Sequence, residues 1–135
     1  MNALHLQLKK LLEITESEDY NHQSSKYHLL EKECEEIISQ IRDYLKNTED
    51  KEEIEKIIKS DPEILYLLRV DLVFDLFHKV FMLGSLDKDL ITTFAYFIHA
   101  YGPDWDEESK KIEEYVAENK FQEAVKIALS IKCYD

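Results

Sequence analysis

Apolar residues recur at helical spacing along nearly the whole chain, and this pattern predicts an all-α protein. The clearest stripe lies between Tyr27 and Leu45. Its apolar positions recur about every three or four residues, as on one face of a helix, and charged residues occupy the other faces. The stripe consists of Tyr27, Leu30, Cys34, Ile37, Ile38, Ile41, Tyr44 and Leu45. We therefore expect a surface helix with one buried side.

Shorter stripes predict a helix on either side of this one. The first helix is expected to run from Asn2, which can cap it, to about Thr15. Its apolar face consists of Leu4, Leu8, Leu11 and Leu12. The other short helix is expected to end near Lys59, and its apolar face consists of Ile54, Ile57 and Ile58.

A longer helix is predicted in the middle of the chain, because strong start and stop signals flank an apolar segment. Asp61 can accept free backbone amides, and Pro62 suits the first helical position. The helix is expected to continue to Leu83, with Gly84 in a left-handed cap. Its polar residues occupy an arc of only about 100°, and they are Asp71, Asp75, His78 and Lys79. This helix should therefore be the central one.

Three further helices are predicted in the C-terminal part. The first begins at Ser85 or Asp87 and ends at Gly102-Pro103. Its expected inward face consists of Leu90, Ile91, Phe94, Ala95, Phe97, Ile98 and Tyr101. Asp104 or Asp106 caps the second, which stops around Asn119, and the last helix runs from about Lys120 to Lys132.

The predicted fold is a single helical domain, residues 1–135, of six to seven helices joined mostly by short loops. Two glycines and two prolines leave few turn residues for a β-rich fold. Short connections favour antiparallel packing of consecutive helices. The layout resembles an α-solenoid of the HEAT or armadillo type, although no sequence repeat of fixed period is present. An antiparallel bundle and a short solenoid-like stack therefore both remain open.

Charge changes the picture more than any motif does. The chain has 29 acidic and 17 basic residues, a formal net charge of −12. Binding of nucleic acid phosphates requires cations, so direct nucleic-acid binding is not expected. The sequence contains neither a secretory signal pattern nor an apolar run of transmembrane length, so we expect a soluble cytoplasmic protein. Two cysteines, Cys34 and Cys133, agree with reduced thiols in that compartment.

The acidic residues gather in two segments. Residues 31–55 contain ten acids against four bases, and residues 104–118 contain seven acids against two bases. Trp105 stands among acids in the second segment, a composition typical of an interface anchor that faces Arg or Lys. The alternative is that Trp105 packs over Ile112, seven residues away on the same face. The candidate partner-binding residues are Trp105, Asp104, Asp106, Glu107, Glu108, Tyr101, Tyr115, Glu31, Glu35, Glu52 and Glu53.

These features indicate a small acidic binding protein that neutralises a basic protein, as immunity proteins and antitoxins neutralise nuclease toxins. A nuclease must be basic to hold nucleic acid, so an inhibitor that covers its cleft must be acidic. Two other functions fit the composition: a DNA mimic of the anti-restriction or regulatory kind, and a helical-repeat scaffold for protein interactions. Acids that serve only solubility or helix dipoles are the simplest alternative.

Catalysis is not expected, since the sequence lacks a glycine-rich phosphate loop and the common metallohydrolase and nucleophile motifs. Cys34 lies on an apolar stripe, where a thiol is inert. No cofactor is expected. The remaining metal hypothesis concerns Asp71, Asp75 and His78 on one side of the central helix, with His99 approaching from the next helix. These residues also form that helix's only polar stripe, which needs solvent or charged partners whether or not a metal is bound. A metal-dependent enzyme is therefore the least favoured of the alternatives.

Overall fold

The computed structural model describes residues 3–60, 68–100 and 103–132, and these ranges contain helices but no strand. The all-α prediction is confirmed. In chain order the helices are α1 (Ala3–Thr15), α2 (Tyr27–Asn47), α3 (Lys51–Ser60), α5 (Val70–Met82), α6 (Lys88–Ala100), the 3-10 helix η1 (Pro103–Trp105), α7 (Asp106–Ala117) and α8 (Phe121–Ser130). Among these described residues, no helix is long and apolar enough to cross a membrane.

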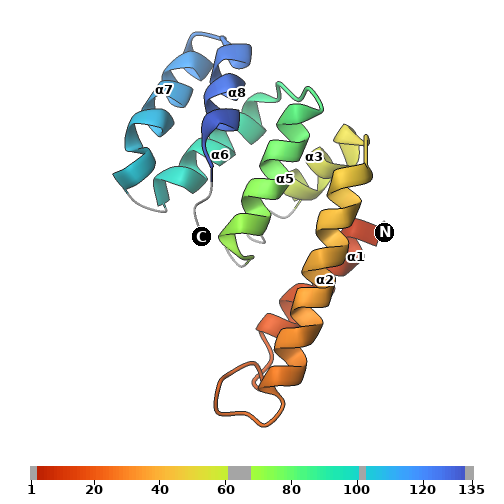
Figure 1. Cartoon of the computed structure of the whole chain (residues 1–135). Coiled ribbons are helices and arrows are strands. Elements are labelled where there is room, and N and C mark those ends of the chain that lie inside the picture. Colours follow the sequence, from red (N-terminus) through yellow and green to blue (C-terminus); the bar gives the residue numbers. More distant parts are fainter. Residues whose placement is uncertain (1–2, 61–67, 101–102, 133–135) are drawn as a thin grey trace.

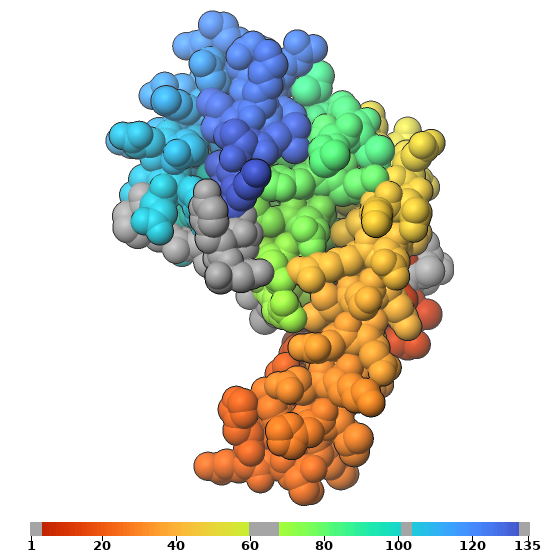
Figure 2. All heavy atoms as spheres, viewed as in Figure 1, coloured from red at the N-terminus to blue at the C-terminus, as the bar shows by residue number. Residues whose placement is uncertain are grey.

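The helices are arranged around α5, as Figure 1 shows. α6, α7 and α8 lie on one side of α5, and α2 and α3 lie on the other. Neighbours along the chain form the most extensive contacts, namely α1 with α2, α6 with α7 and α7 with α8. The hairpin of α1 and α2 projects away from the other helices at its far end, where residues 16–26 connect the two (Figures 1 and 2).

Aromatic packing fixes α5 in the centre of the fold. The rings of Phe74 and Phe77 on α5 lie 5.6 Å and 5.1 Å from the ring of Phe94 on α6. Phe77 and Phe94 are completely buried. Tilted and edge-on ring pairs at this spacing add stabilisation to the burial of their area. The central position predicted for this helix is therefore confirmed, and its buried side chains join those of the other helices in one hydrophobic core.

The predicted left-handed cap at Gly84 is present. Gly84 has a φ angle of 99°, and its N–H donates to the carbonyl of Phe81 at 3.0 Å. The N–H of Ser85 donates to the carbonyl of Val80 at 3.1 Å, which completes a Schellman motif. The same motif ends α7, where Asn119 has a φ angle of 61°. Both helices thus satisfy carbonyls that would otherwise lack partners.

The predicted helix starts agree with the structure at α6 but not at α7. The Asp87 carboxylate accepts the amides of Asp89 at 2.9 Å and Leu90 at 3.2 Å, so Asp87 caps α6. The prediction that Asp104 or Asp106 caps the next helix is wrong, because Trp105 occupies the capping position without a side-chain hydrogen bond. The carboxylate of Asp106 instead contacts the imidazole of a histidine on α6.

The prediction of one helix from Asp61 to Leu83 is also wrong. Leu68 lies in a bend, and Arg69 is extended with φ −59° and ψ 139°, so α5 begins only at Val70. The apolar run continues through this break without a glycine or proline, and hydrophobic periodicity alone therefore gave no sign of it. The start signal predicted at 61–62 and the cap predicted at Asn2 lie outside the described residues.

The left-handed backbone at Gly84 predicts a cost for any side chain there. We expect Gly84→Ala to lower the free energy of unfolding by about 1 kcal/mol, measured by urea denaturation. A β-carbon would meet no atom within 4 Å, so the cost comes from the backbone conformation alone. Gly84→Asn should cost less, because asparagine tolerates this region better. Equal loss in both variants would contradict this explanation.

Candidate functional site

The helical hairpin of α6 and α7 carries a groove that is lined by side chains from both helices. The hydroxyl of Ser109 on α7 is almost fully buried and donates to the carbonyl of Ala95 on α6 at 3.0 Å. This small, hydrogen-bonded residue allows the two backbones to approach closely. The groove has a volume of about 360 Å³ and is lined by Tyr96, His99, Asp106, Glu107, Ser109, Lys110 and Glu113.

The groove combines an exposed aromatic ring with an excess of carboxylates. Tyr96 is 58% exposed, one of the large apolar or aromatic side chains that remain in solvent. Asp106 is paired with the imidazole of His99, at 3.0 Å between Oδ1 and Nδ1. Glu107 and Glu113 form no ion pair with any residue in the described ranges. Their charges are therefore available to a cation from outside the chain.

Trp105, the anchor expected from the sequence, is less exposed to solvent than Tyr96. Its side chain is half-buried against the core, and its ring centroid lies 5.4 Å from that of Phe74 on α5. The more exposed aromatic is Tyr96, which sequence analysis did not select. The available signal was its position off the apolar face of α6, flanked by the inward residues Ala95 and Phe97. An aromatic residue at an outward position is easily overlooked beside a tryptophan among acids.

The other candidates from this segment are divided between surface and partly covered positions. Asp104 and Glu107 are exposed, whereas Glu108 and Tyr115 are half-buried. Tyr115 also packs against the hydrophobic core. Tyr101 lies outside the described residues. The structure therefore brings Asp106 and Glu107 together at the α6–α7 groove, while Tyr115 lines a separate depression beside Lys120 and Phe121.

The acidic segment on α2 and α3 is mostly solvent-exposed, and one of its half-buried acids joins the two helices. The carboxylate of Glu53 accepts a hydrogen bond from the hydroxyl of Tyr44 at 2.6 Å and thereby connects the two helices. Burial, and then this hydrogen bond, raises the pKa of Tyr44. Glu52 and Glu35 are exposed and Glu31 is half-buried. Within the described chain, no carboxylate of residues 31–55 forms an ion pair.

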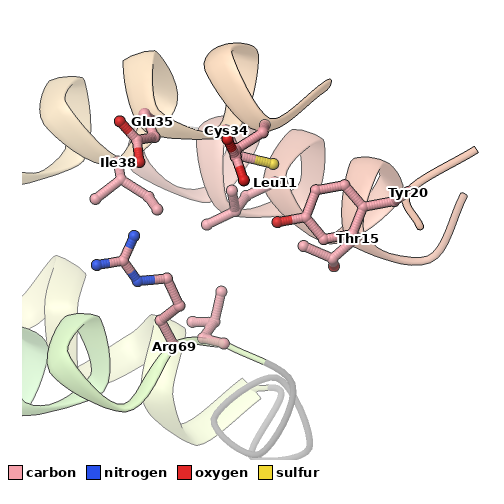
Figure 3. A pocket seen from close by; sticks show the side chains of 9 residues that line it. Leu11, Thr15, Tyr20, Cys34, Glu35, Ile38 and Arg69 are labelled. Atoms are coloured by element: carbon pink, nitrogen blue, oxygen red, sulfur yellow. The ribbon is translucent and has the colours of Figure 1, made fainter. Parts of the chain in front are cut away.

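Glu31 and Glu35 border a cavity of about 170 Å³ between α1, α2 and the residues that precede α5 (Figure 3). Figure 3 shows the Cys34 thiol and the Tyr20 hydroxyl inside it. Burial raises the pKa of Cys34, although a hydrogen bond with Tyr20 opposes the shift. The predicted burial of Cys34 is confirmed, and its thiol is neutral and unreactive at pH 7. Cys133 lies outside the described residues.

The four metal candidates do not form a metal site. In the part of the chain that the structure describes, no three His, Cys, Asp or Glu side chains are placed to hold an ion. Asp71 and Asp75 both bind Arg42 of α2, and the second contact measures 2.9 Å. The other two candidates also have protein partners: His78 Nε2 lies 3.2 Å from the carbonyl of Ala128, and His99 pairs with Asp106. The cluster that the sequence suggested is therefore not formed among the described residues, because an arginine from α2 binds both aspartates.

Asp71 is the most strongly held acid of this group. Its side chain is only 11% exposed and also accepts hydrogen bonds from Arg69, at 3.1 Å and 2.7 Å. Burial by itself would raise the pKa of Asp71, but the hydrogen bonds and charges of Arg69 and Arg42 outweigh it, so the pKa is lowered. Asp71 is therefore ionised in the folded protein, and its pairing with Arg42 holds α2 against α5.

No known protein family, curated protein or solved structure matches this chain. The properties that bear on function are therefore those of its own surface. These are the α6–α7 groove with its exposed Tyr96, and the acidic residues of α2 and α3 without cationic partners in the described chain.

The lowered pKa of Asp71 predicts a pH-dependent effect of its removal. Above the unfolded-state value of 3.8, ionised Asp71 stabilises the fold, and this contribution is lost as pH falls through the lower folded-state pKa. We expect Asp71→Asn to lower the free energy of unfolding by about 2 kcal/mol at pH 7. The difference in unfolding free energy between Asp71→Asn and the unmodified protein should become smaller at about pH 3. Urea denaturation at pH 7 and at about pH 3 measures it.

Asp43→Asn is the matched control, because Asp43 is exposed on α2 and has no ion pair within the described ranges. It should change stability by less than about 0.5 kcal/mol at either pH. A loss for Asp71→Asn that is the same at both pH values would show that charge pairing is not its cause.

Proposed function

We propose that this protein is a small acidic binding protein that neutralises a basic protein partner, of the toxin-immunity or antitoxin type. The observation that carries the proposal is the α6–α7 groove, where exposed Tyr96 lies among Asp106, Glu107 and Glu113. Tyrosine is enriched at the centres of protein interfaces and binds cationic side chains over its ring. An Arg or Lys of a partner could contact Tyr96 while its charge is balanced by Glu107 or Glu113.

The partner class follows from the charge of the whole chain. A net charge of −12 repels acidic proteins and nucleic acid and accelerates association with cationic surfaces. Nucleases carry such surfaces, since their clefts must bind phosphates. The partner that we propose is a nuclease toxin, whose cleft the protein would cover. Under this proposal the protein acts by binding rather than by catalysis, in the cytoplasm, without a cofactor.

The acidic residues are suited to binding because the fold does not use most of them. Glu107 and Glu113 have no cationic partner in the described chain, and neither do the exposed acids of α2 and α3. Acids in the first turn of α7 favour the helix dipole, and this explains Asp106, Glu107 and Glu108 in part. It does not explain Glu113, in the second half of the helix, or the exposed ring of Tyr96.

The proposal predicts salt-sensitive capture of a basic nuclease. The immobilised protein should retain such a protein from cell extract at low salt, release it as salt rises, and inhibit its nuclease activity when the two are recombined. The double variant Glu107→Lys/Glu113→Lys should weaken the affinity at least about tenfold, and Tyr96→Ala should cost about 1–2 kcal/mol of binding free energy. Isothermal titration calorimetry with the captured nuclease measures both effects.

Two controls separate binding from charge and from folding. Glu16→Lys/Glu18→Lys makes the same charge change in the exposed connection after α1 and should leave the affinity within about threefold of the original value. Trp105→Ala should lower the free energy of unfolding by about 2–3 kcal/mol, because its ring packs on Phe74, yet affect binding less than Tyr96→Ala does. If no basic protein is retained at low salt, or if the retained nuclease keeps its activity, the proposal is wrong.

A further inference from the structure

A second groove lies between α2 and α5, and cationic and apolar side chains make up most of its lining. Its volume is about 460 Å³, and it is lined by Arg42, Leu45 and Lys46 from α2 and by Asp75, His78, Lys79 and Met82 from α5. Figure 1 shows these two helices next to each other, and Figure 2 shows the same side of the molecule with all atoms. None of these residues belongs to the α6–α7 groove.

Cations outnumber anions in this groove, although the chain as a whole carries a net charge of −12. Arg42, Lys46 and Lys79 contribute positive charge, and Asp75 is the acid among the lining residues. Arg42 is engaged by Asp71 and Asp75, whereas Lys46 and Lys79 form no ion pair with a described residue. The two ammonium groups are thus available to an anionic ligand.

His78 does not add to this positive charge at pH 7. Burial lowers its pKa below 6.5, despite the opposing effects of the backbone at Ala128 and Ile131 and of the charge of Asp75. The neutral ring donates from Nε2 to the carbonyl of Ala128 on α8 at 3.2 Å, which leaves Nδ1 as an acceptor. The electrostatic attraction of the groove therefore comes from its lysines and arginine.

The groove also contains an apolar contact surface. Met82 is 71% exposed at the end of α5, and the buried Leu45 lines the groove on the α2 side. Methionine adapts its shape to irregular partners and is common at protein-binding surfaces. An exposed methionine in the same groove as two lysines suits a ligand that has both carboxylates and an apolar side chain.

Both lysines also lie in the last turns of their helices, where cations favour the helix dipole. This local effect explains a basic residue at each helix end. It does not explain why Met82 remains exposed in the same groove or why the space there is open. A role in helix stability and a role in binding are also separable, because the first changes the unfolding free energy and the second changes an affinity.

We propose that the α2–α5 groove binds an acidic segment of a partner protein, with carboxylates at Lys46 and Lys79 and an apolar side chain on Met82. The groove is open and formed by two packed helices, which fits an extended or helical segment that lies along it. The net negative charge of the chain disfavours binding of such a segment to its acidic surfaces, and the two lysines of the groove would therefore select the site. The proposal is independent of the α6–α7 groove, because its partner carries the opposite charge.

The test uses a fluorescein-labelled peptide of about twelve residues, with Glu at most positions and Leu at helical spacing. We expect saturable binding by fluorescence anisotropy. Lys46→Glu/Lys79→Glu should weaken it at least about tenfold, Lys46→Arg/Lys79→Arg should retain it, and Met82→Ser should weaken it without a change of charge. A peptide with Ser in place of Leu should bind more weakly than the original.

The matched control is Lys9→Glu/Lys132→Glu, which makes the same charge change at two exposed lysines outside the groove. Thermal unfolding of every variant checks that it is folded. The proposal is overturned if the labelled peptide does not bind, or if the control variant weakens binding as much as Lys46→Glu/Lys79→Glu does. It is also overturned if sedimentation shows that the groove lysines instead hold a second copy of this chain.

Discussion

A helix that is apolar around most of its circumference has to be covered on most of its sides, and α5 imposes this requirement on the whole molecule. Its residues Leu72, Val73, Leu76, Phe77 and Val80 are completely buried. The other helices take positions around it, with α6 held through aromatic rings and α2, α3 and α8 in contact with the remaining faces. Burial of this apolar area is the main source of stability available to a chain of this size.

The narrow polar strip of α5 decides how α2 joins this core. Asp71 and Asp75 cannot be covered by apolar side chains without loss of their hydration, and Arg42 supplies the required counter-charge. An ion pair placed there keeps α2 close to α5 at one point, while Lys46 and Met82 leave an open groove beside it. The polar residues of an otherwise apolar helix thus account for two features. They hold α2 against α5, and they lie beside the cationic groove.

The two grooves differ in the sign of the charge that lines them. Carboxylates without internal partners in the described chain lie on α2, α3 and α7, and those on α7 meet Tyr96 at the α6–α7 groove. The cationic side chains Lys46 and Lys79 face the α2–α5 groove instead. Such a division gives each groove its own electrostatic preference, and the two proposed interactions do not compete for the same residues.

The sequence by itself determined the local features of this protein. Helical class, the apolar face of α2, the left-handed cap at Gly84 and the start of α6 at Asp87 all follow from residues within a few positions of one another. The break at Arg69 was missed because no glycine or proline marks it and the helical spacing of apolar residues continues on both sides.

Only the tertiary structure decided which side chains meet. Arg42 reaches Asp71 and Asp75 from 29 and 33 positions away, and this contact is formed in place of the cluster that spacing on one helix suggested. The covering of Trp105 by Phe74 and the exposure of Tyr96 depend likewise on how α5, α6 and α7 pack. Periodicity and capping act over single turns, whereas burial and ion pairing depend on where distant helices come to lie, and the spacing of residues along one helix contains no information on that.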